Sequence, residues 1–199
     1  AIAFSSGAAS TRWANETGRK CVIFDNARLQ DVPRGRWINF LKKMVYSGVD
    51  AILCPAPPWN DTYHFFGFND SQIFYGLNVV DNSFWLKTSG NHNPELPGKY
   101  FLSVGRQIPK KNFLFLLKSY KDYCRKNSDP ADLVLVGNGP KRKILEVFIK
   151  ENGLKVHLLD FTTQDDLRSI YHNALCFILP SRYGETWGLV VIEAMASGL

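Results

Sequence analysis

The sequence predicts an α/β protein with doubly wound parallel sheets, divided into two domains. Short apolar runs typical of buried strands alternate along the chain with longer segments of helical periodicity, which is the pattern of a parallel sheet covered by helices on both faces. Residues 81–98 are rich in Pro, Gly and Asn and interrupt this alternation. We therefore expect a first domain over residues 1–80, an inter-domain linker over residues 81–98 and a second domain over residues 99–199.

The first domain alternates strands and helices from its first residue. Strands are expected at residues 1–5, 21–25, 51–55 and 72–80. One helix runs through Trp13 to Gly18, and a short helical piece contains His64 and Phe66. Between them, a helix over residues 37–46 has an apolar stripe, the face that a helix normally packs on a core; the stripe consists of Phe40, Leu41, Met44 and Val45.

The second domain repeats the alternation more regularly. Strands are expected at residues 99–105, 131–137, 155–160 and 175–180, and helices at residues 111–127, 140–153, 164–174 and from about residue 188. Pro140 at the start and Gly153 at the end are typical boundary residues of a helix. A doubly wound sheet orders its strands 3-2-1-4-5 and binds ligands at the carboxyl ends of those strands.

Composition and charge exclude several classes of protein. The apolar fraction of 45% supports a folded core, and no run approaches the roughly 18 apolar residues of a membrane span. Of the net charge of +6, residues 1–98 carry +1 and residues 99–199 carry +5. Much of this charge falls on expected helix surfaces, which favours attraction of an anionic ligand or a membrane surface over nucleic-acid binding. The four cysteines form no Cys-x-x-Cys pair and fit a reducing cytoplasm.

Two carboxylates lie in the last stretch of the chain. Glu193 is the one acidic residue on a nearly apolar helix, and Glu185 lies in the loop before that helix. The backbone N–H groups of Trp187, Gly188 and Leu189 are expected to be open to an anion or to sugar oxygens at the helix N-terminus. The alternative is a buried helix packed on a sheet, in which a local donor satisfies Glu193.

This stretch, GETWGLVVIEAMASG, directly follows the strand LCFILP and resembles the paired-glutamate motif of retaining glycosyltransferases of family 4. The resemblance implies the GT-B fold, in which two Rossmann-like domains bind a nucleotide-diphosphate sugar and an acceptor. It assigns Glu193 to the ribose hydroxyls and Glu185 to the transferred sugar. The same resemblance includes Thr186, between these two glutamates, among the donor-binding residues.

The loop GRQIPKKN after the first strand of the second domain contains two basic residues in one strand-to-helix turn. Arg106 and Lys111 could be solvated surface residues, but such a turn is also a common phosphate clamp. With Gly105, the loop resembles the family's Gly-Arg…Lys signature, in which the Arg and the Lys hold the donor diphosphate. By that resemblance Arg106, Lys111 and Glu185 are the catalytic residues.

Two further loops complete the predicted donor site. Gly137, Asn138 and Gly139 directly follow a buried strand; the glycines permit close backbone approach to a nucleotide, and an ordinary strand-to-helix turn is the alternative. Phe161 and Thr162 resemble the segment whose backbone holds the nucleotide base in the family. Family members usually have Gly where this chain has Asp160, so the identity of the base stays open.

In the first domain, Asp25 ends a strand that is expected to face the cleft. Many family members carry a histidine at about this place that contacts the donor sugar. Asp25 is therefore a candidate acceptor or sugar contact, and the alternative is an aspartate that caps its own loop.

The sequence thus predicts a retaining glycosyltransferase of family 4 that moves a sugar from a nucleotide-diphosphate donor to a glycan or lipid-linked acceptor. An epimerase or phosphorylase of the same fold and a non-catalytic nucleotide-sugar binding module are the alternatives. No Asp-x-Asp box occurs in the sequence, so neither a metal nor another cofactor is implied. We expect a cytoplasmic location, with peripheral contact to the inner face of the membrane as an alternative.

The resemblance also implies that the chain is a fragment of a longer enzyme. The first domain corresponds to the C-terminal half of an acceptor domain, and the second lacks the last elements of a donor domain. On this view the fragment is inactive by itself and associates through its open sheet edges.

Overall fold

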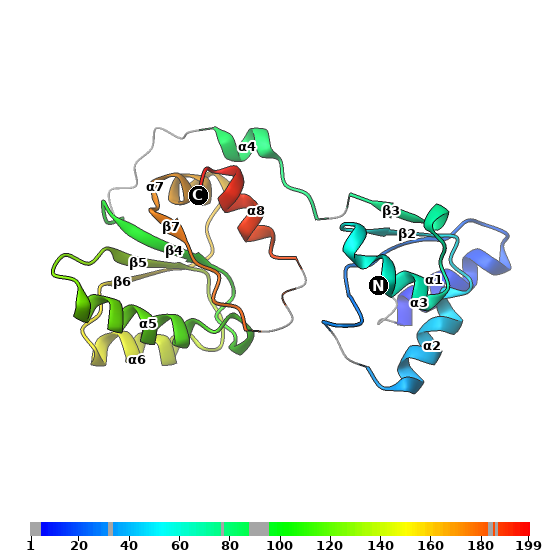
Figure 1. Cartoon of the computed structure of the whole chain (residues 1–199), viewed down its shortest axis with the longest axis horizontal. Coiled ribbons are helices and arrows are strands. Elements are labelled where there is room, and N and C mark those ends of the chain that lie inside the picture. Colours follow the sequence, from blue (N-terminus) through cyan, green and yellow to red (C-terminus); the bar gives the residue numbers. More distant parts are fainter. Residues whose placement is uncertain (1–4, 32–33, 77, 88–95, 183–184, 186) are drawn as a thin grey trace. The chain divides into compact units, whose positions relative to one another are not determined.

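The computed structural model describes residues 5–31, 34–76, 78–87, 96–182, 185 and 187–199. The chain forms two compact units, Ala1–Val79 and Val80–Leu199, and each is an α/β unit with a parallel sheet (Figure 1). Among the described residues, no helix combines the length and the hydrophobicity of a membrane-spanning segment.

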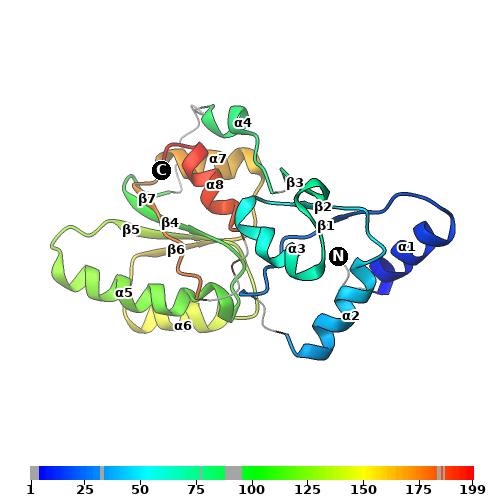
Figure 2. The ribbon, with the colours of Figure 1, turned by 45° about the vertical axis from the view of Figure 1, so that its right-hand side comes forward.

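The first unit has a three-stranded parallel sheet in the order β1-β2-β3. Its elements are α1 (Ser5–Glu16), β1 (Val22–Phe24), α2 (Arg36–Tyr46), β2 (Ala51–Cys54), α3 (Asn60–Phe66) and β3 (Ile73–Tyr75). The helices α2 and α3 lie on one side of these strands (Figure 2). That side is the core, because Ile23, Ile52 and Ile73 are buried with Tyr46 and Tyr63.

Two predicted strands of this unit differ from the structure at their ends. Residues 1–4 of the first lie outside the described residues, and Ser5, which was expected to end that strand, instead begins α1. The strand predicted over residues 72–80 pairs only from Ile73 to Tyr75. Gly76 and Asn78 then adopt positive φ angles of 121° and 62°, a conformation that an extended strand cannot contain.

The apolar stripe predicted for the helix at residues 37–46 does not pack on the core as expected. Phe40, Leu41 and Met44 are each more than half exposed. The helix instead turns Lys42 and Tyr46 inward, where both contact the carboxylate of Asp25. A buried carboxylate needs such partners, and this requirement decides which face of α2 packs on the sheet.

The second unit has a four-stranded parallel sheet. Its elements are α4 (Asn82–Leu86), β4 (Tyr100–Val104), α5 (Phe113–Lys126), β5 (Asp132–Val136), α6 (Arg142–Glu151), β6 (Val156–Leu159), α7 (Gln164–Asn173), β7 (Cys176–Phe177) and α8 (Leu189–Ala196). The strand order β6-β5-β4-β7 confirms the predicted order 3-2-1-4. The predicted strand at residues 175–180 is shorter as a ladder, although Ile178 still donates a backbone hydrogen bond to Leu102.

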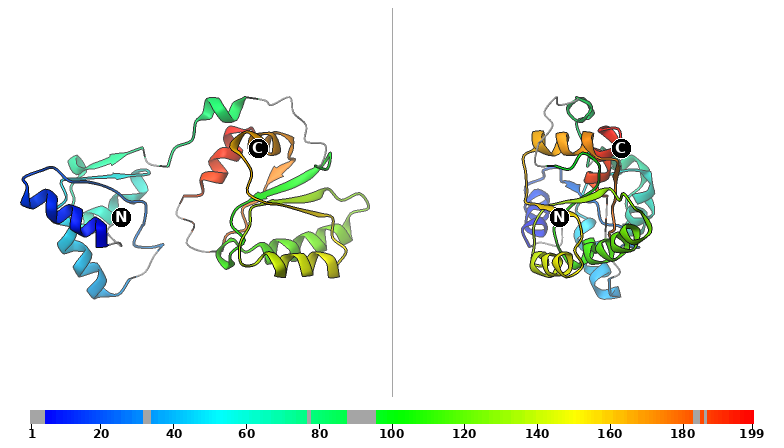
Figure 3. Two further views of the ribbon diagram at one scale, coloured as in Figure 1. Left: turned by 180° about the vertical axis from the view of Figure 1, so that it is seen from behind. Right: turned by 90° about the vertical axis from the view of Figure 1, so that its left-hand side faces the viewer.

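Helices cover both faces of this sheet (Figure 3). α5 and α6 lie on one face, and α4, α7 and α8 lie on the other. Along β5, Leu133 and Leu135 join the core under α5, while Val134 and Val136 join the core under α7 and α8. This alternation is the period of two that a strand requires when both of its faces are buried.

Part of the segment predicted to be a linker is helical. Asp81 caps α4 by accepting a hydrogen bond from the Phe84 amide at 3.1 Å. Trp85 is buried in the same core as Tyr171, and the guanidinium of Arg168 lies 4.4 Å from the centre of the Phe84 ring. These residues therefore belong to the second unit, and a linker role for the rest of residues 81–98 stays a prediction.

Candidate functional site

The glycine-rich loop after β5 packs directly on the loop after β4. A Cβ atom on Gly137 would lie 2.3 Å from the carbonyl oxygen of Gly105, and one on Gly139 would lie 2.7 Å from that of Gln107. The backbone N–H of Gln107 also donates to the backbone carbonyl of Asn138 at 3.0 Å. The glycines are thus required by contact between two backbones of the protein itself, which is a structural reason for them that the sequence alone did not reveal.

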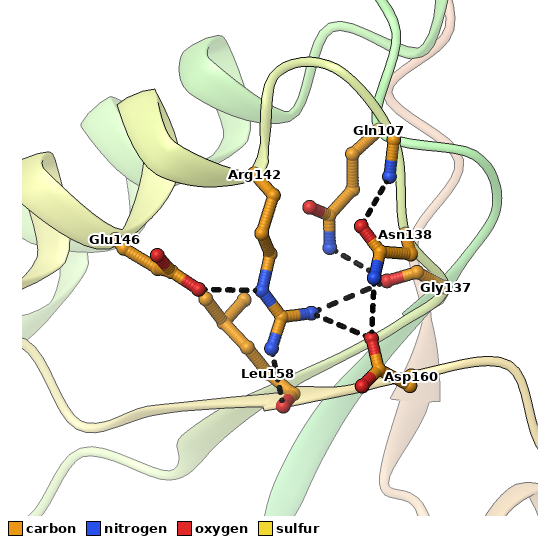
Figure 4. A network of polar contacts seen from close by, with 8 residues as sticks. Gln107, Gly137, Asn138, Arg142, Glu146, Leu158 and Asp160 are labelled. Carbon is orange, nitrogen blue, oxygen red and sulfur yellow. Dashed lines mark hydrogen bonds and ion pairs between the residues drawn. The ribbon is translucent and has the colours of Figure 1, made fainter.

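A network of polar contacts fixes this loop to the end of β6 (Figure 4). Arg142 donates to the carbonyls of Gly137 and Leu158 at 3.4 and 3.1 Å, and the Asn138 amide donates to Asp160 at 2.7 Å. The Arg142 guanidinium lies 3.6 Å from the same Asp160 carboxylate. Asp160, the departure from the family pattern, therefore bonds to neighbouring side chains of its own sheet edge.

Phe161 follows Asp160 and presents a large exposed ring. It is 66% exposed, yet its edge lies 3.6 Å from the position of a Cβ on Gly137. Thr162 is also exposed and donates to Asp166 at 3.2 Å. The structure thus brings Phe161 beside the glycine loop, where an aromatic face is available for stacking.

Lys111 and Glu185 form an ion pair across the carboxyl end of the sheet. The Lys111 Nζ and a carboxylate oxygen of Glu185 are 2.6 Å apart, and the Ser181 hydroxyl donates to the same oxygen at 2.8 Å. Burial acts to raise the pKa of Glu185, but the bonds from Lys111 and Ser181 outweigh it and hold that pKa below its ordinary value. Two residues predicted from separate loops therefore meet in one ionised pair.

The ion pair lies beside the other predicted site residues. The Lys111 side chain passes within 3.3 Å of the position of a Cβ on Gly105, and the Glu185 side chain lies 3.7 Å from that of Gly188. Gly188 is the N-cap residue of α8; it has a φ of 77° and supplies no side-chain cap, so the helix N-terminus keeps its positive end. Leu189 is partly exposed there and Trp187 is half-buried, while Thr186 lies outside the described residues.

Arg106 differs from Lys111 in its surroundings. Its side chain is exposed, and within the ranges that the structure describes its guanidinium makes no hydrogen bond or ion pair. An unpaired cation in the turn after β4 is available to an anionic ligand.

Glu193 has a partner that the sequence did not predict. The Tyr171 hydroxyl lies 3.2 Å from its carboxylate and 3.1 Å from the Val190 carbonyl. Burial raises the pKa of Glu193, and the bond from Tyr171 opposes that rise. Glu193 therefore has a nearby donor, as in the alternative considered from the sequence, and that donor comes from α7.

Asp25 in the first unit is buried, and its carboxylate is surrounded by hydrogen-bond donors. Its carboxylate accepts hydrogen bonds from Lys42 at 3.0 Å, from the Ala27 amide at 3.1 Å and from Tyr46. Burial acts to raise the pKa of Asp25, but Lys42 and Tyr46 hold it below its ordinary value. These bonds favour the loop-capping alternative over a substrate contact.

Part of the chain matches a known protein family and several curated proteins. Residues 87–199 match the family described as Glycosyl transferases group 1. An uncharacterised glycosyltransferase of Methanocaldococcus jannaschii is 34% identical over 134 residues, which is 66% of this chain and 33% of that protein. A sulfoquinovosyl transferase of Arabidopsis thaliana is 36% identical over 109 residues, 55% of this chain and 19% of that protein. The chain thus spans about a third or less of these curated relatives.

Solved structures show the same fold. HepE of Anabaena, determined in complex with UDP and glucose, superposes with a TM-score of 0.73 at 15% identity. The superposition covers 96% of this chain and 55% of the HepE chain. The pneumococcal O-GlcNAc transferase GtfA, in complex with UDP and GlcNAc, superposes with a TM-score of 0.72 at 17% identity. This superposition covers 97% of this chain and 38% of the GtfA chain. The chain therefore has the Rossmann-like architecture of GT-B glycosyltransferases, as predicted.

Proposed function

Because the chain belongs to the glycosyl transferases group 1 family, we propose that it carries the donor site of a retaining, family 4 glycosyltransferase. The reaction moves a sugar from a nucleotide-diphosphate donor to a glycan or lipid-linked acceptor. The observation that supports this most is the ion pair of Lys111 and Glu185, which lies next to Gly105 and the uncapped N-terminus of α8.

In this proposal the leaving diphosphate is neutralised by three positive groups. Arg106 is exposed and unpaired among the described residues, Lys111 has two further N–H donors beyond its bond to Glu185, and α8 offers the positive end of its dipole. Charge that develops on the diphosphate in the transition state is stabilised by donors already held in place. A resident metal is not part of the proposal, since the sequence has no Asp-x-Asp box.

The two glutamates take different parts of the donor. The lowered pKa of Glu185 keeps its carboxylate ionised, so that it accepts hydrogen bonds from the hydroxyls of the transferred sugar. Glu193 accepts hydrogen bonds from the ribose hydroxyls through its carboxylate oxygens, and the hydroxyl of Tyr171 fixes the orientation of that carboxylate. The base stacks on the exposed ring of Phe161, and UDP is the first nucleotide to test because HepE and GtfA were solved with it.

The experiment is product analysis with donors labelled in the sugar. The longest natural form of the protein is incubated with UDP-, GDP- and ADP-sugars and with glycan or lipid-linked acceptors, and NMR reads the anomeric configuration of the product. Transfer with retention is expected. Inversion contradicts family 4 chemistry, an epimerised or phosphorolysed sugar points to the other enzymes of this fold, and binding without turnover points to a binding module.

A further inference from the structure

A cavity lies at the start of α5 and α6, on the helices that cover one face of the second sheet. It has a volume of about 230 Å³, and its walls include the apolar side chains of Ile108, Phe113, Leu114 and Ile144. Arg106, Lys111, Glu185 and Phe161 are not among the described residues that line it. The cavity is therefore separate from the donor site proposed above.

One wall of the cavity is a buried side chain with an unused acceptor. Gln107 is 1% exposed and donates through Nε2 to the Gly137 carbonyl at 2.7 Å. That bond fixes the amide, so its Oε1 points away from Gly137 and toward α6 (Figure 4). Among the described residues Oε1 has no hydrogen-bond partner. Leaving a buried acceptor unsatisfied is costly, so a hydroxyl or N–H group in the cavity would remove that cost.

The electrostatics of the cavity are positive. α5 has 14 residues and α6 has 10, and neither has a side-chain cap or an acidic residue in its first turn. Lys141 immediately precedes α6 and lines the cavity. No acidic residue is present among the described lining residues. Two helix N-termini and one ammonium group favour an anion.

We propose that this cavity binds a small organic anion with an apolar body and a hydroxyl group. The hydroxyl donates to Gln107 Oε1, the apolar body lies among Ile108, Phe113 and Ile144, and the anionic group faces Lys141 and the first turns of α5 and α6. Each of the three parts answers one observed feature of the cavity. Gln107 directly follows Arg106 in the chain, so such a ligand would also hold the loop that carries the predicted diphosphate clamp.

The probe is 4-hydroxybenzoate, compared with benzoate and phenol, and the readout is the backbone amide spectrum of the isotopically labelled chain. Progressive shifts are expected in the first turns of α5 and α6, with a dissociation constant on the order of 1–10 mM for a molecule of this size. Benzoate lacks the donor to Gln107 and phenol lacks the anion. Each is therefore expected to bind about fivefold more weakly.

Two variants on the exposed side of α6 make the test specific. Ile144→Trp fills the cavity and should abolish the shifts, whereas Val147→Trp, one turn later and equally exposed, should leave them unchanged. If Ile144→Trp does not fold, Lys141→Ala serves instead and should weaken the two benzoates but not phenol. Absence of shifts, equal binding of benzoate and 4-hydroxybenzoate, or unchanged binding to Ile144→Trp would overturn the proposal and leave ordered water as the partner of Gln107.

Discussion

At the scale of single residues, the site contains two carboxylates whose ionisation is set by burial and by the hydrogen bonds that oppose it. Glu185 is kept ionised by Lys111 and Ser181 against the effect of burial. Glu193 is shifted the opposite way, because burial dominates and Tyr171 only partly offsets it. Two carboxylates on one short stretch of chain thus have different ionisation properties, as expected when their environments differ.

Replacing Lys111 by Ala should raise the pKa of Glu185. Burial raises this pKa, and without Lys111 the hydrogen bond from Ser181 is the main interaction that still lowers it. Carbon NMR titration of the glutamate carboxyl groups measures this, and Lys110→Ala, which removes the weaker of the two lysine charges that act on Glu185, is the control. In the wild type the lowered pKa adds stability that is present above the ordinary carboxyl range and is lost as the pH falls through the lowered value. An unchanged titration of Glu185 in Lys111→Ala would contradict the ion pair.

Replacing Tyr171 by Phe should raise the pKa of Glu193 further, because the hydrogen bond that lowers it is removed. The loss of the buried hydroxyl should also reduce the free energy of unfolding by about 1 kcal/mol. Tyr100→Phe is the matched control, since its buried hydroxyl donates to the Ile170 carbonyl at 2.7 Å. It should cost similar stability and leave Glu193 unaffected. Equal carboxyl titrations in the two variants would show that Tyr171 does not act on Glu193.

At the scale of elements, the site is built by loops that follow four parallel strands. The loops after β4 and β5 touch through glycine backbones, and the loops after β4 and β7 are joined by Lys111 and Glu185. The Arg182 amide also donates to the Lys110 carbonyl at 3.1 Å. Packing between loops therefore gives the site its shape, while the sheet gives it its position.

A side chain at Gly137 should disrupt this packing. In Gly137→Ala the new Cβ would lie 2.3 Å from the Gly105 carbonyl oxygen, at a φ of 121°. The free energy of unfolding should fall by about 3 kcal/mol or more, in the range of the most damaging substitutions. Gly153→Ala is the control, because Gly153 also has positive φ but open space around it, and it should cost only about 1–2 kcal/mol. Denaturant unfolding compares them, and equal losses would refute the loop contact.

The sequence predicted the elements of the second sheet because apolar runs and helix boundary residues are local signals, and the rule for doubly wound sheets then gave the order of the strands. The same periodicity failed for α2, where Lys42 and Tyr46 pack inward to satisfy Asp25, a contact between residues far apart in the chain. It also missed Tyr171 as the donor to Glu193 and α4 within the segment read as a linker. Family resemblance supplied Lys111 and Glu185 individually, whereas their pairing appears only once the strands are placed side by side.

At the scale of the whole chain, one face of the sheet in the first unit presents exposed apolar side chains. Phe24, Leu53 and Phe74 form a row across β1, β2 and β3 by their register, and Phe24 and Phe74 are each more than half exposed. Parallel sheets are normally covered on both faces, and outer strands offer unpaired backbone groups to another chain.

The chain should therefore associate with itself in solution, with an apparent mass that increases with concentration. Light scattering at several concentrations measures this. The double substitution of Phe24 and Phe74 by Ser should reduce the association, and Phe115→Ser, at an equally exposed position on α5, should not. A monomer at every concentration, or equal association in both variants, would contradict a role for this face.

The proposed roles of Arg106 and Lys111, which are to hold the diphosphate of a nucleotide donor, can be tested by calorimetry on the folded chain. The nucleotide among UDP, GDP and ADP that binds the wild type is titrated into Arg106→Ala and Lys111→Ala beside its free nucleoside, with Lys118→Ala as a surface control. Each site variant should lose affinity for the nucleotide diphosphate by about 1–3 kcal/mol, the range for a charged hydrogen bond. The affinity of each variant for the free nucleoside should be unchanged. Equal losses for both ligands, or none, would contradict the claim.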